Sequence, residues 1–298
     1  MRSRIEHDGT LALAPSRLMD YFTLTKPELT FLSVVTALGG FYLGVQGAIP
    51  LATMLHTLFG TFLVGGGAGA LNQYIERHYD ALMRRTENRP LPAGRLAPSE
   101  AVLFGSLLSI TGVVELCVFA NILSGFLALT TLLTYLFLYT PLKRITWTST
   151  LVGGIPGALP PMIGWTAARN EITIEAWILF GILFFWQMPH FFSLAWMYRK
   201  DYERAGYPML TVLDSDGKQT GLQILFFCLG LIPVSLLLTL YGGLGWTYFA
   251  GALVTGSLFL YFGIHLLLTK SNASAKRMFF ASLLYLPALL AFIVLDKL

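Results

Sequence analysis

The sequence contains little charge. Asp, Glu, Lys and Arg make up only 12% of its 298 residues, about half the share that is usual in a soluble domain. The mean hydropathy is correspondingly high, at +0.65. These values exclude an ordinary soluble domain and predict an all-α helix bundle that crosses a membrane several times.

Cysteine is almost absent as well. The two cysteines, Cys117 and Cys228, lie in apolar runs and have no partner at the spacing of a metal site, so we expect both to be packing residues. A glycine-rich stretch at 65–70 lacks the Lys-Ser or Lys-Thr that ends a phosphate-binding loop. We therefore interpret these glycines as contacts between membrane helices.

Long apolar runs are, in contrast, abundant. A membrane helix needs about 20 residues, and windows of that length predict about nine transmembrane helices. The predicted spans are 29–46, 50–71, 100–119, 122–140, 147–166, 173–195, 220–241, 245–268 and 278–296. Pro156, Pro160 and Pro161 predict that the fifth span is irregular and borders a cavity.

Lysine and arginine are distributed unevenly among the predicted loops. Of the 20 Lys and Arg residues, 18 fall on one side of the membrane, and only Arg169 and Lys297 fall on the other. Because positive residues stay on the cytoplasmic side during insertion, we expect a cytoplasmic N-terminus and a C-terminus outside, in the cell membrane if the organism is a prokaryote. Residues 1–25 would form a polar cytoplasmic lead, without a cleavable signal peptide, within a single membrane domain over 1–298. The same bias accounts for the net charge of +4, so no nucleic-acid partner is expected.

The most polar stretch, residues 72–95, stands between two uncharged runs. Ionisable groups next to hydrocarbon cost free energy, so such a cluster indicates a functional site. Asn72, Glu76 and Asp80 recur every four residues and would project from one face of a helix. Three arginines follow them: Arg84, Arg85 and Arg89. Oxygen ligands beside arginines suit a divalent hard cation that holds a phosphorylated substrate.

Two further segments are predicted to leave the membrane on the same side. They are 139–144, at the end of the fourth span, and 198–210, after the sixth. A helix bundle can gather both around one mouth with 72–95. The first and third segments each place carboxylates and cations past an inner helix end, like two halves of a pseudo-repeat, although no internal sequence repeat is visible.

Several stretches together match a known family. They are Leu24-Thr25-Lys26-Pro27, the run Asn72 to Asp80, Arg85-Thr86-x-x-Arg89-Pro90-Leu91-Pro92, Tyr139-x-x-x-Lys143-Arg144, Gly157-Ala158-Leu159-Pro160-Pro161-Met162-Ile163-Gly164-Trp165, Trp186-Gln187-x-Pro189-His190-Phe191 and Asp201-Tyr202-x-x-Ala205-Gly206-x-Pro208-Met209. Through them the chain resembles the UbiA-type intramembrane prenyltransferases, and within these the heme O synthases, over nearly its whole length. Each stretch alone is a weak signal, whereas the combination is specific.

The resemblance implies a reaction. A farnesyl group would pass from farnesyl diphosphate to a vinyl group of protoheme IX, with addition of water, to give heme O. Mg²⁺ would be the metal cofactor, and heme B would be a substrate and not a permanent cofactor. The implied partners are farnesyl diphosphate, protoheme IX and the lipid bilayer, and a heme A synthase or an oxidase assembly protein is a further partner to test.

The resemblance also implies roles for individual residues. The metal would be held by Asn72, Glu76, Asp80 and Asp201. The diphosphate would contact Arg85, Arg89, Tyr139, Lys143, Arg144, Arg199 and Lys200. Catalysis would depend on Asn72, Asp80, Lys143 and Asp201. His190 follows the helix-bending Pro189 and would contact heme, with simple packing as the alternative.

Two positions depart from the family's pattern. Glu76 stands where the superfamily usually has Asp, and Asp201 is the one aligned Asp where other members have several, which leaves a second metal ion open. Cations outside the matched stretches, among them Arg84, Arg204 and Lys270, are explained by membrane topology.

Two other functions also fit the chain. One is prenylation of an aromatic quinone precursor, which the Trp186–Phe191 and Asp201–Met209 stretches disfavour. The other is a small-molecule membrane transporter, which should carry its polar residues near the middle of the bilayer. Here they gather at the inner boundary, so prenyl transfer to heme is the preferred interpretation.

Overall fold

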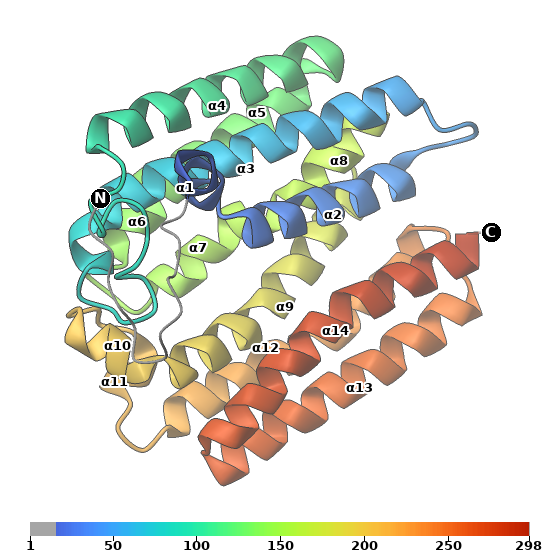
Figure 1. Ribbon diagram of the computed structural model, residues 1–298. Helices are drawn as coiled ribbons and strands as arrows, with labels where there is room; N and C mark the ends of the chain where they lie inside the picture. The colour runs from blue at the N-terminus through green and yellow to red at the C-terminus, as the bar shows by residue number, and fades with distance from the viewer. Residues whose placement is uncertain (1–15, 298) are drawn as a thin grey trace.

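The computed structural model describes residues 16–297, and all regular structure in that part of the chain is helical (Figure 1). Within residues 16–297, seven helices are long and apolar enough to cross a membrane. They are α3 (Leu51–Asp80), α4 (Pro98–Phe119), a run made of α5 (Ile122–Leu133), η1 (Thr134–Tyr139) and α6 (Thr140–Leu142), α9 (Ile174–Met197), α12 (Lys218–Tyr241), α13 (Trp246–Thr269) and α14 (Asn272–Lys297). The prediction of an all-α, polytopic membrane bundle is confirmed.

The other two predicted spans take different forms. Residues 29–46 fall on α2 (Pro27–Gly44), an 18-residue helix. Residues 147–166 fall on two ten-residue helices, α7 (Ser149–Ala158) and α8 (Pro160–Arg169). Proline lacks the amide hydrogen that would continue a helix, and Pro160 begins the second of the two helices. The predicted irregularity of this span is therefore confirmed, whereas the total of nine spans and the side of each terminus stay predictions.

Two groups of helices build the bundle. In Figure 1 the helices from α1 (Arg17–Leu24) to α8 form one group, and α9 with α12, α13 and α14 forms the other. Within the first group α3 packs against α4 and α2 packs against α8, while α7 joins the groups by packing against α9. A cavity described below lies between the two groups.

Small residues allow the closest of these contacts. A Cβ atom on Gly67 of α3 would overlap Ser109 and the Gly105 carbonyl of α4. A Cβ on Gly164 of α8 would overlap the backbone of Ala37 in α2. The interpretation of the glycine-rich stretch as a helix contact is therefore confirmed.

The two cysteines are packing residues, as predicted. Cys228 is buried in the core of the second helix group, and Cys117 packs against Gly125 of α5. Neither forms a disulfide.

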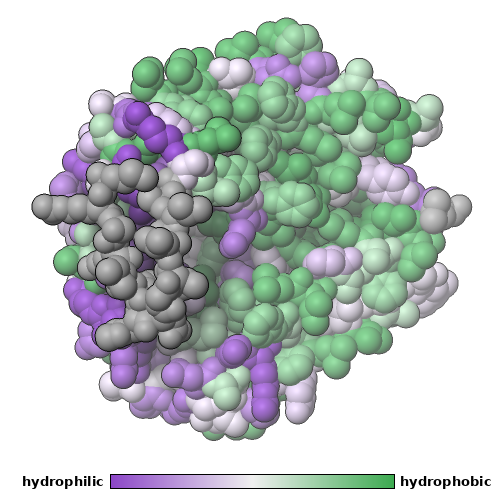
Figure 2. Space-filling view, viewed as in Figure 1, coloured by the Kyte–Doolittle hydropathy of each residue, from purple (hydrophilic) through white to green (hydrophobic). Residues whose placement is uncertain are grey.

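Polar residues gather at one end of the molecule. Figure 2 shows hydrophilic surface at the end where α3 finishes and where the short helices α10 (Arg199–Arg204) and α11 (Leu210–Leu213) lie, and apolar surface along the helix flanks. At this end α1 is held to the 81–97 loop by Asp20, which accepts a hydrogen bond from Arg95 at 2.9 Å. Leu18, Met19 and Phe22 of α1 are exposed, as expected for a helix that lies along a membrane surface.

The opposite end is closed by the last residues described. Lys297 Nζ donates to the carbonyl oxygens of Tyr42, Leu43 and Val45 at 2.6, 3.2 and 3.1 Å. These carbonyls belong to the end of α2, where no helical amide reaches them. The contact ties α14 to α2 and so joins the two helix groups.

Candidate active site

The charged face of α3 lies at the polar end of the bundle. Because α3 stays helical as far as Asp80, Asn72, Glu76 and Asp80 share one face, as predicted. All three are buried, with exposed fractions of 1%, 2% and 1%. Buried charged groups require partners, so the face must be matched by cations.

Each of the three residues has its own cationic partner. Lys26 Nζ donates to Asn72 Oδ1 at 2.5 Å. Lys143 Nζ donates to Glu76 Oε1 at 2.8 Å, and Arg89 Nη1 donates to Asp80 Oδ2 at 2.8 Å. The partners come from three segments: the start of α2, the residue after α6 and the 81–97 loop.

Lys26 was not among the site residues predicted from the sequence. It has φ +48° and ψ +61°, a left-handed conformation that is uncommon for a residue other than glycine. Such strain persists only where the surroundings impose it, often at a functional site. Burial lowers the pKa of its ammonium group to about 7. The one signal in the sequence was its place in the Leu24–Pro27 stretch, which carried no assigned role.

Lys143 lies among tyrosines as well as beside Glu76. Its Nζ is 5.7 Å from the ring centre of Tyr139 and 5.1 Å from that of Tyr207. The Tyr207 hydroxyl donates to Glu76 Oε1 at 3.5 Å. Burial opposes the charge on Lys143, but the Glu76 carboxylate raises the pKa of the ammonium group well above its ordinary value. Lys143 therefore carries a full positive charge at neutral pH.

Two more of the predicted cations lie around this centre without touching its carboxylates. Arg85 Nη2 donates to the Tyr202 hydroxyl at 3.0 Å. Arg144 Nη2 donates to the carbonyl of Ile75 at 2.9 Å, and its guanidinium lies 4.1 Å from the ring centre of Tyr79. They add positive charge next to residues that flank the carboxylates of α3.

The third predicted segment reaches the centre through its tyrosines. Tyr202 and Tyr207 contact Arg85 and Glu76, whereas Arg199, Lys200 and Asp201 line a separate hollow of the same end. Asp201 pairs with Arg204, with 3.6 Å between Oδ1 and Nη1. Residues 16–297 hold no group of three His, Cys, Asp or Glu side chains placed to bind one metal ion. The metal role of Asp201 and the diphosphate role of Arg199 and Lys200 remain predictions.

The α3 face alone nevertheless suits Mg²⁺. This ion is commonly bound through one or two carboxylates, with waters and substrate phosphates as the other ligands. Glu76 and Asp80 supply the carboxylates, and the Asn72 amide oxygen points to the same side. The three cations that now donate hydrogen bonds to these oxygens are of the kind that binds phosphate. The donor set therefore fits a metal–diphosphate pair better than a metal alone.

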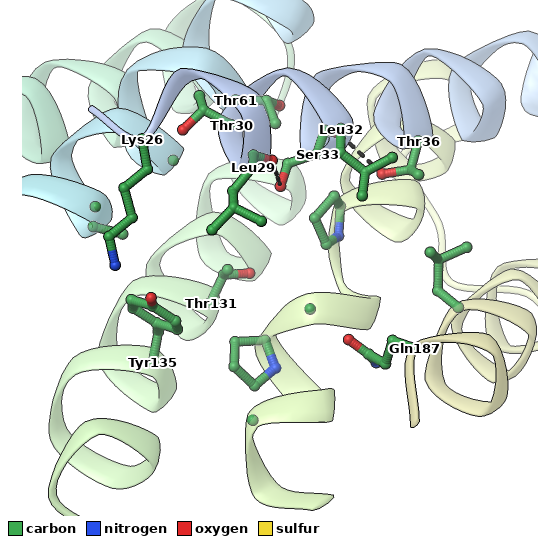
Figure 3. Close-up of a pocket in the computed structure, with 18 of the residues that line it drawn as sticks. Lys26, Leu29, Thr30, Leu32, Ser33, Thr36, Thr61, Thr131, Tyr135 and Gln187 are labelled. Carbon is green, nitrogen blue, oxygen red and sulfur yellow. Dashed lines mark hydrogen bonds between the residues drawn. The ribbon is translucent and has the colours of Figure 1, made fainter. Parts of the chain in front are cut away.

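An apolar cavity of about 240 Å³ opens beside Lys26 (Figure 3). It is lined by α2, α3, α5, η1, α7, α8 and α9, with aliphatic side chains from Leu29, Leu32, Val64, Ile163 and Leu183. A few polar groups interrupt this lining: Thr30, Ser33, Thr36, Thr61, Thr131 and Gln187. A long hydrocarbon chain is the kind of ligand that such a lining suits.

The shape of the cavity depends on the irregular backbone around it. Residues 134–139 form a π-helical turn, and Tyr135 and Tyr139 of this turn line the cavity. Across it, Gly153 of α7 lies against the Tyr139 ring and Gly157 lies against Gln187. Pro156 and Pro160 also line the cavity, which confirms that the irregular span borders it. Insertions of this π type occur often at functional sites.

His190 also lines this cavity. Its Nδ1 is hydrogen-bonded to Ser282 Oγ at 2.7 Å, and its ring packs against Trp186 and Phe279, with ring centres 5.4 and 4.7 Å away. Because Ser282 occupies Nδ1, Nε2 is the ring nitrogen left for a ligand. The geometry is compatible with both alternatives for His190, heme contact and packing.

Comparison with known proteins extends this description. Residues 33–284 match the UbiA prenyltransferase family. A protoheme IX farnesyltransferase from Solibacter usitatus is 47% identical over 289 residues, which cover 94% of this chain and 99% of the relative. Another from Salinibacter ruber is 46% identical over 279 residues, with coverages of 94% and 99%.

Solved structures share the fold. A digeranylgeranylglyceryl phosphate synthase superposes with a TM-score of 0.79 at 19% identity, covering 95% of this chain and 99% of that one. A UbiA homologue from Archaeoglobus fulgidus, bound to GPP and Mg²⁺, gives a TM-score of 0.66 at 14% identity, with coverages of 92% and 99%. At these identities the similarity establishes a common architecture and no more.

Proposed function

The chain belongs to the UbiA prenyltransferase family, and from this premise we propose that it transfers a farnesyl group from farnesyl diphosphate to a vinyl group of protoheme IX, giving heme O. The acceptor follows from relatives of 46–47% identity that match along their whole length. The observation that carries the chemistry is the α3 face, whose Asn72, Glu76 and Asp80 are each paired with a cation next to an apolar cavity.

Binding of the donor would exchange these pairs. The diphosphate oxygens would take over Lys26, Lys143 and Arg89, and the freed oxygens of Asn72, Glu76 and Asp80 would hold Mg²⁺. When bound, the ion supplies charge neutralisation of the diphosphate leaving group. The guanidinium groups of Arg85 and Arg144 would attract the negatively charged diphosphate toward this site. The farnesyl chain would then extend along the cavity lined by α2 and α7.

The proposed transfer has three steps: ionisation of the donor, formation of the carbon–carbon bond and addition of water. The allylic carbon–oxygen bond breaks, and its electron pair leaves with the diphosphate. The vinyl group then forms the new carbon–carbon bond, which moves the positive charge to the vinyl carbon next to the porphyrin ring. Water adds to that carbon and loses a proton to the released diphosphate. The residues of the chain would stabilise the first step by their positive charge.

The apolar lining would protect the cation until the last step. Water is excluded from a cavity lined by aliphatic side chains, which prevents premature capture of the allylic cation. The rings of Tyr135 and Tyr139 line the same cavity and can stabilise a passing cation through their π faces.

The proposal is tested by product analysis. The protein in nanodiscs is supplied with reduced heme B, farnesyl diphosphate and Mg²⁺, and the pigment is analysed by mass spectrometry for the mass of heme B plus one farnesyl group and one hydroxyl group. Parallel reactions contain an aromatic quinone precursor in place of heme, and Asp80→Asn serves as the inactive control. Product from the aromatic acceptor alone would overturn the heme proposal and support the quinone alternative.

His190 would contact the acceptor. We expect His190→Ala to lose heme binding and transfer while it keeps farnesyl diphosphate binding, because the imidazole is hydrogen-bonded to Ser282 and not to Asn72, Glu76 or Asp80. Ser282→Ala is the matched control, since it removes the hydrogen bond to Nδ1 and leaves the imidazole in place. Unchanged heme affinity in His190→Ala would show that the imidazole only packs.

The same proposal places the reaction at a membrane surface. The chain is a multi-pass membrane protein, and the excess of Lys and Arg at the mouth favours a cytoplasmic site in the cell membrane. The donor would arrive from the cytoplasm, whereas the hydrophobic acceptor can arrive through the bilayer. A heme A synthase or an oxidase assembly protein would be a reasonable recipient of the product.

A further inference from the structure

A charged hollow lies at the polar end of the bundle, apart from the apolar cavity described above. It measures about 460 Å³ and lies where the ends of α9, α12, α13 and α14 meet α10. Five cationic side chains line it, Arg84, Arg199, Lys200, Arg204 and Lys270, against two carboxylates, Asp201 and Asp216. We call this group the cationic hollow.

Most of its positive charge is not neutralised within the described chain. Asp201 pairs with Arg204 at 3.6 Å, and Asp216 pairs with Lys270 at 3.8 Å. Asp216 also accepts the backbone N–H of Lys218 at 3.0 Å. Arg84, Arg199 and Lys200 form no ion pair with a carboxylate of residues 16–297. The hollow therefore attracts anions.

The cationic hollow is distinct from the transfer site. None of its lining residues lines the apolar cavity, and none is hydrogen-bonded or ion-paired to the side chain of Asn72, Glu76 or Asp80. Trp196, which lines it, lies on the side of α9 opposite Gln187, because nine residues separate the two along the helix. The apolar cavity and the cationic hollow therefore lie on opposite sides of α9.

Its position corresponds to the level of lipid headgroups. The hollow lies at the ends of membrane-spanning helices, at the end of the bundle where α10 and α11 lie and where Figure 2 shows hydrophilic surface. Leu213 and Leu268, close to its rim in the chain, are 60% and 76% exposed. Trp196 lines the hollow, and tryptophan is enriched at the membrane interface.

The loop before α12 packs closely against Trp196. Gly217 has φ +71°, and a Cβ atom there would overlap the Trp196 ring. The close approach of this backbone to Trp196 holds the indole between α9 and α12. The result is a preformed recess with an apolar wall and a cationic rim.

We propose that the cationic hollow binds the phosphate headgroup of an anionic phospholipid from the leaflet at the polar end of the bundle. The guanidinium groups of Arg84 and Arg199 match phosphate oxygens, and the exposed leucines would contact the acyl chains. A soluble anion would have the same affinity for the arginines, but it would gain nothing from the leucines. The lipid is therefore the better occupant, and its binding does not depend on the identity of the prenyl acceptor.

The test compares two double variants that lose the same charge. Arg84→Gln/Lys270→Gln removes two cations from the hollow, and Lys276→Gln/Arg277→Gln removes two exposed cations from the neighbouring first turns of α14. Each protein is placed in neutral phosphatidylcholine nanodiscs and titrated with spin-labelled phosphatidylglycerol. We expect the first variant to bind the label roughly tenfold more weakly than wild type, and the control to bind it about as well. Equal binding by the two variants would overturn the proposal.

Two further measurements keep the result decisive. Inorganic phosphate is added as a competitor at the same concentration as the labelled lipid. Displacement of the lipid under these conditions would show that the hollow binds a soluble anion and would overturn the lipid assignment. Farnesyl diphosphate binding is measured on the same variants, and it should not change. A loss of donor binding in Arg84→Gln/Lys270→Gln would make the hollow part of the transfer site and so overturn its assignment to lipid. If the double variant fails to fold, Arg84→Gln alone is titrated against Arg277→Gln, with the same expected order.

Discussion

At the scale of single residues, the candidate site is an arrangement of paired charges. Glu76 and Asp80 are both almost fully buried, and a buried carboxylate without a partner is strongly destabilising. Lys143 and Arg89 supply the partners at 2.8 Å each. A metal–diphosphate complex would have to separate these same pairs. The side chains that stabilise the free protein are therefore also the ones that would bind the donor.

Loss of Asp80 should stop transfer without unfolding the protein. In Asp80→Ala the partner Arg89 is 26% exposed and can remain hydrated, so the helix bundle should survive.

Asn72→Ala should behave in the same way as Asp80→Ala, and Glu76→Asp should retain more activity than Glu76→Ala because the carboxylate is kept. The measurements are heme O formation and its dependence on Mg²⁺, with Glu203→Ala, an exposed carboxylate of α10, as the control. Full activity of Asp80→Ala would exclude a metal role for this face.

Lys143 should contribute to donor binding more than to heme binding. A lost charge-assisted contact is worth about 1.5–3 kcal/mol, so Lys143→Met should bind farnesyl diphosphate roughly ten- to a hundredfold more weakly. Titration of both ligands on the purified variant checks this. Lys143→Arg should recover part of the affinity, and Arg77→Met, which loses a cation bound to Tyr74 on the same helix, should bind normally. If Lys143→Met binds the donor normally, the lysine serves topology and the Glu76 pair alone.

At the scale of elements, two irregular helices shape the cavity. The π-helical turn at 134–139 brings Tyr135 and Tyr139 to the cavity, and α7 and α8 replace one continuous span. Regular helices in both places would present different side chains. The irregularity is thus the local cause of the pocket's shape.

A side chain added at Gly153 should therefore disturb the site. In Gly153→Ala the new Cβ would lie 2.6 Å from the Tyr139 ring, so the ring must shift. Overpacking of this kind costs about 1–3 kcal/mol, and we expect at least a tenfold loss of transfer. Gly263→Ala is the matched control, because its Cβ would meet Cys228 Sγ at 3.2 Å and Ile224 at 3.4 Å, a much smaller overlap than at Gly153. Equal rates for the two variants would show that the Tyr139 position does not matter.

At the scale of the whole molecule, the cavity depends on how two helix groups are joined. α7 packs against α9 beside the cavity, and Lys297 joins α14 to the end of α2 at the opposite end of the bundle. A change at the closed end should thus affect stability before it affects chemistry.

Removal of the Lys297 contact should lower stability modestly. Lys297→Met loses hydrogen bonds to three carbonyls at the end of α2, an effect of about 1 kcal/mol. The corresponding fall in Tm is roughly 2–4 °C, measured by thermal unfolding in nanodiscs, with unchanged transfer at low temperature. Lys276→Met, whose ammonium lies over the Phe280 ring at 6.0 Å, should not lower Tm. A fall of equal size in both variants would refute the specific role of Lys297.

The sequence by itself determined the features that depend on near neighbours in the chain. Apolar runs of membrane length predicted the helices, and the four-residue spacing of Asn72, Glu76 and Asp80 predicted their common face, because helix geometry is a local property. The proline positions likewise predicted the broken span, because a missing amide hydrogen acts on its own helix.

Only the tertiary structure decided which distant residues meet. Lys26 lies 46 positions before Asn72 and Tyr207 lies 131 positions after Glu76, and no periodicity relates such pairs. The same holds for Arg199 and Lys200, which share a sequence segment with Tyr207 but line another hollow. The direction of each side chain was set by how α10 packs after α9 and by the need of every buried carboxylate for a nearby cation. That requirement can be stated from the sequence, but the residue that meets it depends on the packing of the whole bundle.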